Sequence, residues 1–117
     1  MSSPKYFKAE VLYMSIGSTD RGIVSEILSL FIENLKDLEK AIKSPGVTES
    51  YWHSLAESAH RYKTPAMSVG SLILAAKLDE LEDAIYSSQL QLAREVISEL
   101  PRIISQTRGE IRDFLEM

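Results

Sequence analysis

Apolar residues recur at helical spacing along nearly the whole chain, and this periodicity limits what the chain can fold into. Side chains three or four residues apart share one face of a helix, whereas a strand requires strict alternation, which no stretch shows convincingly. Turn-forming residues interrupt the pattern at Gly17-Ser18-Thr19-Asp20 and at Ser44-Pro45-Gly46. We therefore expect helices at approximately residues 6–16, 20–43, 49–64, 67–86 and 88–115.

Short connections between long amphipathic helices favour antiparallel neighbours. The expected fold is therefore all-α: an antiparallel up-down-up-down four-helix bundle with a short N-terminal helix, forming a single domain over residues 1–117. Thr48 or Ser50 can cap the third helix, and Ser88 with Gln91 matches a capping box at the start of the fifth. The buried stripe of the second helix is expected to contain Ile23, Ile27, Leu30, Phe31, Leu38 and Ile42.

The composition excludes several classes of function. The chain has no apolar run near the roughly 18 residues of a membrane span and no secretion signal, so we expect a cytoplasmic protein without membrane association. It has no cysteine, which excludes disulfides, thiolate metal sites and a cysteine nucleophile. The net charge is −4 and the basic residues are scattered, so we expect no nucleic-acid binding. Nothing in the pattern requires a dimer, and a monomer is expected.

His60 is the residue best suited to carry chemistry, because the chain has two histidines and no Gly-rich phosphate loop. At about 100° per residue, the helix around His60 forms one apolar arc. His60 falls about 120° from the centre of that arc, so we expect it to be at least partly exposed. Lys63 lies between His60 and the arc, where its stem can cover apolar surface while its ammonium reaches towards the imidazole. The arc consists of Trp52, Leu55, Ala59, Tyr62 and Ala66.

A histidine in this setting can carry a phosphoryl group. A neutral imidazole nitrogen is nucleophilic near pH 7 without the help of a strong base. A nearby ammonium can offset the charge that accumulates on the phosphoryl oxygens. An exposed position on a helix also gives a partner protein access to a rigidly mounted ring.

Two other interpretations of this helix remain open. A half-exposed helical histidine is commonly a solvated surface residue without a role. Alternatively, His53, Glu57 and His60 share a flank and are plausible zinc ligands, although one tetrahedral ion would strain to bridge histidines about 10.5 Å apart along the axis. In the next helix, the acidic residues Asp79-Glu80 and Glu82-Asp83 are expected to form a solvated face that influences partner choice by charge.

A local motif resembles that of a known family. His60 is followed, two and three positions on, by an apolar residue and Lys63, and nine and ten positions on by Val69 and Gly70. This order and spacing resemble the signature of the histidine-containing phosphotransfer (HPt) family. The similarity covers roughly residues 20–86, and the two ends are similar only in their helical pattern.

The resemblance implies a phosphorelay intermediate of a two-component signal-transduction system, in which His60 accepts a phosphoryl group from a receiver-domain aspartate and passes it to another receiver. Lys63 would stabilise the phosphate, and Glu57, Arg61 and Thr64 would border the receiver-docking surface. Such a module is not an enzyme with its own turnover and has no cofactor, since Mg²⁺ is expected on the receiver. Its partners would be response-regulator receiver domains or a hybrid histidine kinase. The alternative is a helical adaptor that binds a receiver or another signalling partner without phosphorylation.

The chain departs from the family pattern one turn beyond His60. Where the family usually has glycine followed by a small residue, this chain has Thr64-Pro65. Thr64 adds a branched side chain where a receiver would dock, and Pro65 cannot donate a hydrogen bond to the Arg61 carbonyl. We therefore expect the helix to kink or to end early just beyond His60, with an altered partner choice or transfer rate.

Overall fold

The computed structural model describes residues 5–43 and 48–117, and within these ranges it contains helices and no strand. The predicted all-α class is therefore confirmed for the described part of the chain. The turn expected at Ser44-Pro45-Gly46 lies outside the described residues. The helices are α1 (Ala9–Ile16), α2 (Arg21–Lys43), α3 (Glu49–Ser68), α4 (Leu72–Tyr86) and α5 (Leu90–Leu115).

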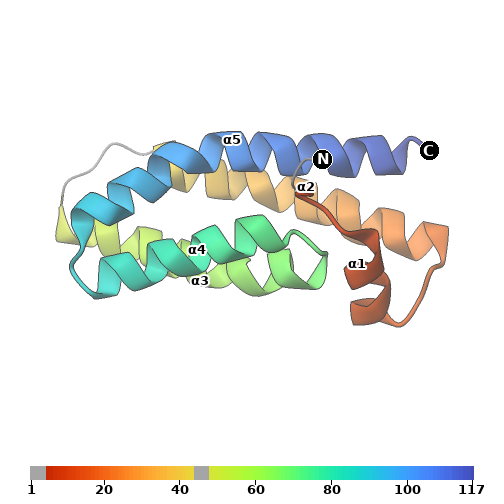
Figure 1. Ribbon diagram of the computed structural model, residues 1–117, viewed down its shortest axis with the longest axis horizontal. Coiled ribbons are helices and arrows are strands. Elements are labelled where there is room, and N and C mark those ends of the chain that lie inside the picture. The colour runs from red at the N-terminus through yellow and green to blue at the C-terminus, as the bar shows by residue number, and fades with distance from the viewer. Residues whose placement is uncertain (1–4, 44–47) are drawn as a thin grey trace.

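The four long helices lie side by side in a compact bundle, as Figure 1 shows. Each contacts the helix that follows it in the chain, and α2 also contacts α5, so the contacts form a closed ring. α1 lies at one end of the bundle and contacts α3. The most extensive contacts are those between α3 and α4. Among the described residues, no helix is both long and apolar enough to cross a membrane.

The buried stripe of α2 differs from the predicted one. Half of the predicted residues are buried, but Ile23 and Leu30 are 47% and 63% exposed, and Ile27 is only half-buried. The stripe through these three residues next meets the polar Asn34, whereas the stripe beside it stays apolar along the whole helix. α2 therefore turns the longer stripe inward, which contains Val24, Leu28, Phe31, Leu35, Leu38 and Ile42.

α3 does not end at Thr64 but continues through Pro65 to Ser68, so the predicted early end of the third helix is wrong. Pro65 cannot donate a hydrogen bond to the carbonyl of Arg61 one turn earlier. Arg61 is exposed and Pro65 is half-buried, so this carbonyl lies towards the solvent side of the helix, where water can satisfy it. Because α3 is longer than predicted, α4 begins at Leu72 and not near residue 67.

The helix caps agree with the sequence at α3 and differ from it at α5. Thr48 caps α3, since its side chain accepts a hydrogen bond from the backbone N–H of Tyr51. The predicted capping box at Ser88 is wrong, because α5 begins at Leu90 with Gln89 at its N-cap and no side-chain cap hydrogen bond. Ser88 instead adopts a left-handed conformation, with φ of 59°. An N-cap residue typically requires an extended backbone, so Ser88 serves the turn after α4 and not the start of α5.

The N-terminal segment ties α5 to the turn between α3 and α4. Glu110 on α5 accepts hydrogen bonds from the backbone N–H groups of Tyr6 and Phe7, at 2.9 and 3.1 Å. The next residue, Lys8, donates its N–H to the Gly70 carbonyl at 3.0 Å. Gly70 has φ of +89°, and a Cβ at this position would lie 2.2 Å from the Lys8 carbonyl oxygen. The glycine of the HPt-like motif therefore has a structural role in this chain.

Gly70→Ala should destabilise the fold by about 2 kcal/mol or more, because positive φ and the contact with Lys8 both oppose a side chain. Gly109→Ala is the matched control. It lies inside α5 with open space around its Cβ position, so alanine should stabilise the fold by about 0.5–1 kcal/mol. Urea denaturation measures both changes, and equal stability of the two variants would contradict the role assigned to Gly70.

Candidate functional site

His60 lies on the exposed side of α3, and its side chain is 70% exposed. The prediction from helical spacing that His60 is at least partly exposed is therefore confirmed. Its Nδ1 atom lies 2.9 Å from Oε2 of Glu82 on α4. An ionised carboxylate can only accept hydrogen bonds, so this contact favours the neutral tautomer that carries its proton on Nδ1. In the neutral ring, the available lone pair is then on Nε2.

Glu82 connects His60 to Lys63. The Glu82 side chain is 12% exposed, and its second oxygen, Oε1, accepts a hydrogen bond from Lys63 Nζ at 3.0 Å. Lys63 Nζ also donates to Oδ1 of Asp79, at 2.9 Å. The hydrogen bond to Asp79, followed by the one to Glu82, raises the pKa of Lys63 above its ordinary value of 10.5. Lys63 is therefore an ammonium at neutral pH, and it is paired with two carboxylates of α4.

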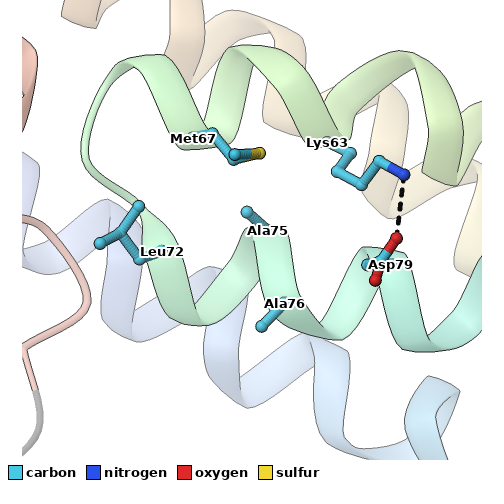
Figure 2. Close-up of a pocket in the computed structure, with 6 residues that line it drawn as sticks. All are labelled: Lys63, Met67, Leu72, Ala75, Ala76 and Asp79. Carbon is cyan, nitrogen blue, oxygen red and sulfur yellow. Dashed lines mark hydrogen bonds and ion pairs between the residues drawn. The ribbon is translucent and has the colours of Figure 1, made fainter.

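The Lys63 side chain lies partly as the sequence predicts. Its stem lines an open, largely apolar hollow of about 430 Å³ between α3 and α4, which Figure 2 shows. Its ammonium points to α4, where Figure 2 marks the ion pair with Asp79. The connection from Lys63 to the imidazole of His60 therefore runs through Glu82. The other residues that line this hollow are Met67, Leu72, Ala75, Ala76 and Asp79.

His53 and Glu57 form a separate pair on α3. His53 Nε2 lies 2.6 Å from Glu57 Oε1, and both side chains are more than half exposed. His53 thus uses the opposite ring nitrogen from the one that His60 uses. The described residues contain no group of three or more histidine, cysteine, aspartate or glutamate side chains placed to hold a metal ion. The geometry therefore does not support the zinc interpretation, because the two histidines turn to different carboxylates.

The residues predicted to border a docking surface lie around His60. Glu57 and Arg61 line an open hollow of about 340 Å³ together with His60 and Tyr86, the last residue of α4. We call this the His60 hollow. Thr64 is exposed but does not line it. In the part of the chain that the structure describes, the Arg61 guanidinium has no ion pair or hydrogen bond. The docking role of these residues stays a prediction.

The sequence interpretation missed Glu82 and Asp79, which it assigned to a solvated acidic face. In the structure, Glu82 is mostly buried and contacts two side chains of α3. The positions of these two residues along α4 were the signal in the sequence that could have indicated this contact. Asp79 and Glu82 are three residues apart and share one side of α4, and Asp79 lies one turn beyond the buried Ala75. Glu82 also lies one turn beyond the buried Leu78, at the edge of the face that packs inward.

Comparisons with known proteins identified no relative of this chain. No protein-family model, curated protein or solved structure matches this chain. The functional interpretation therefore depends on the geometry of the site and on the motif around His60.

The two histidines should occupy opposite tautomers once their rings are neutral, with the proton on Nδ1 of His60 and on Nε2 of His53. Long-range ¹H–¹⁵N correlation spectra distinguish the two forms. Glu82→Ala should release His60 from its tautomer and leave His53 unchanged, and Glu57→Ala should do the reverse. The same tautomer at both histidines of the wild-type protein would contradict this assignment.

Proposed function

We propose that this protein is a phosphotransfer module of the HPt type, with His60 as the residue that carries the phosphoryl group. The observation that carries the proposal is the exposed imidazole whose Nδ1 is held by Glu82, which leaves the Nε2 lone pair available as the nucleophile. The HPt-like motif of His60, Lys63 and Gly70 supports the same proposal from the sequence.

The proposed reaction begins with an aspartyl phosphate on a receiver domain. The Nε2 lone pair of His60 attacks phosphorus, the bond from phosphorus to the aspartate oxygen breaks, and the aspartate leaves as a carboxylate. The product ring is positively charged as long as Nδ1 keeps its proton. The Glu82 carboxylate, 2.9 Å from Nδ1, stabilises that charge. Transfer to a second receiver uses the same atoms in the opposite order.

Lys63 acts in this proposal mainly as a positioning residue. Its ammonium has three N–H donors, and two of them are used by Asp79 and Glu82. The ion pair holds the Glu82 carboxylate against α3, and this carboxylate orients the ring of His60. The third donor is left for a phosphoryl oxygen or for water.

The proposed partners are response-regulator receiver domains or a hybrid histidine kinase. The receiver would supply Mg²⁺ and the acidic residues for the transfer, and this chain would have no turnover of its own. Glu57, Arg61 and Thr64 would meet the receiver around His60. The proposal includes an antiparallel up-down-up-down order of α2 to α5, which the closed ring of helix contacts supports.

A phosphorylation-independent adaptor is the second candidate function. The observation in its favour is Thr64, an exposed, branched residue one turn beyond His60, which adds bulk where a receiver would approach the ring. An adaptor would bind the receiver through the same face of α3, but the imidazole would have no chemical part in it.

His60→Gln should abolish phosphotransfer, because glutamine has no nucleophilic ring nitrogen. The protein is mixed with a panel of receiver domains that carry labelled aspartyl phosphate and Mg²⁺. Label that is acid-labile and base-stable should then appear on the wild-type protein. His53→Gln is the matched control, since it removes the other histidine of the chain and should still accept label.

Label that still appears on the His60→Gln variant would contradict the carrier role of His60. If receivers bind wild type and His60→Gln with equal affinity and label moves to neither protein, the adaptor function replaces the proposal.

A further inference from the structure

The charge around His60 raises a problem for a phosphorylated ring. A phosphoryl group carries roughly two negative charges near neutral pH and presents three acceptor oxygens. Lys63 is one ammonium between two carboxylates, so the group of Lys63, Asp79 and Glu82 keeps one uncompensated negative charge. Glu57 adds another carboxylate to the wall of the His60 hollow. The nearest ammonium is therefore already neutralised.

Arg61 is the cation that lines the His60 hollow, and in the described part of the chain no carboxylate is paired with it. It lines the hollow together with His60 and Tyr86, and within the described residues its guanidinium makes no ion pair. A guanidinium presents a planar fork of N–H donors that matches two phosphoryl oxygens at once, which an ammonium does not.

The sequence of α3 explains why Arg61 is left available. Helical side chains form ion pairs with residues three or four positions away. Glu57, four residues before Arg61, is held by His53 at 2.6 Å. On the other side of Arg61, the corresponding positions are Thr64 and Pro65, which carry no charge. Within the described residues, no acidic residue of α3 therefore forms an ion pair with the Arg61 guanidinium.

We propose that Arg61, and not Lys63, holds the phosphoryl group once it is on Nε2 of His60, with the His60 hollow as the phosphoryl site. This inference rests on the proposed function, because it concerns the same phosphohistidine. The guanidinium pairs with the phosphoryl oxygens and stabilises phospho-His60 in its ground state, so we expect it to slow loss of the group to water.

The test uses phosphoramidate, a small donor that needs no receiver. The ring nitrogen attacks phosphorus, the donor's bond from phosphorus to nitrogen breaks, and ammonia leaves. Both His60 and His53 are exposed, so ³¹P NMR should give two phosphohistidine signals, assigned with His60→Gln and His53→Gln. Phospho-His53 then serves as an internal reference for phospho-His60 in the same sample.

Arg61→Ala should shorten the half-life of phospho-His60 about threefold, as expected for an exposed charge pair, and should raise the pKa of its phosphoryl group in a ³¹P titration. Phospho-His53 should not change. Arg61→Lys should restore part of the effect, because it returns the charge without the planar fork. Arg112→Ala, an exposed arginine of α5, is the matched control and should behave as wild type.

An unchanged half-life and phosphoryl pKa in Arg61→Ala would overturn the inference, and so would labelling of His53 without His60. If Lys63→Met produces the change and Arg61→Ala does not, Lys63 is the phosphate-holding cation. Failure of the proposed function is distinguishable from these results: phosphoramidate then labels His60 with the expected dependence on Arg61, but no receiver exchanges the group.

Discussion

The close packing of α3 against α4 is the constraint on which the site depends. Because the two helices lie close together, the carboxylate of Glu82 reaches both His60 and Lys63 while it stays 12% exposed. A carboxylate with so little access to water requires polar partners, and α3 provides a hydrogen bond from Lys63 and a close contact with Nδ1 of His60. The same contact fixes the ring. Both helices also carry buried alanines, and such small side chains favour close packing of helices: Ala56, Ala59, Ala66, Ala75 and Ala84.

The turn between α3 and α4 links the glycine of the HPt-like motif to its histidine. Gly70 adopts a positive φ and lies against the Lys8 backbone, so the turn is held at the point where the N-terminal segment crosses it. Glu110 anchors that segment to α5. The register of α4 along α3 follows from this turn, and the position of Glu82 beside His60 follows from the register. His60 and Gly70, the two ends of the motif, are ten residues apart. Both belong to the same arrangement, because the turn at Gly70 determines where Glu82 lies beside His60.

The sequence predicted those features that depend on local periodicity, namely the existence of the helices, the Thr48 cap and the exposure of His60. It failed where tertiary contacts decide between local alternatives. Two apolar stripes on α2 look alike locally, and only packing against α3 and α5 selects the one without Ile23 and Leu30. The partners of His60 depend on α4, and the spacing along α3 contains no information about Glu82.

The carboxylates that orient the side chains of this site also add negative charge, which disfavours a phosphoryl group. Glu82 and Asp79 hold the ring and Lys63 in place, but their carboxylates also make the surroundings of Nε2 unfavourable for a phosphoryl group. For a proposed carrier this conflict is useful, since a group held too strongly would not move to the next receiver. An exposed guanidinium such as Arg61 compensates the charge only partly, because water screens it. The proposed phosphohistidine would thus be stable enough to persist between partners and still be a good donor to a receiver that brings its own Mg²⁺.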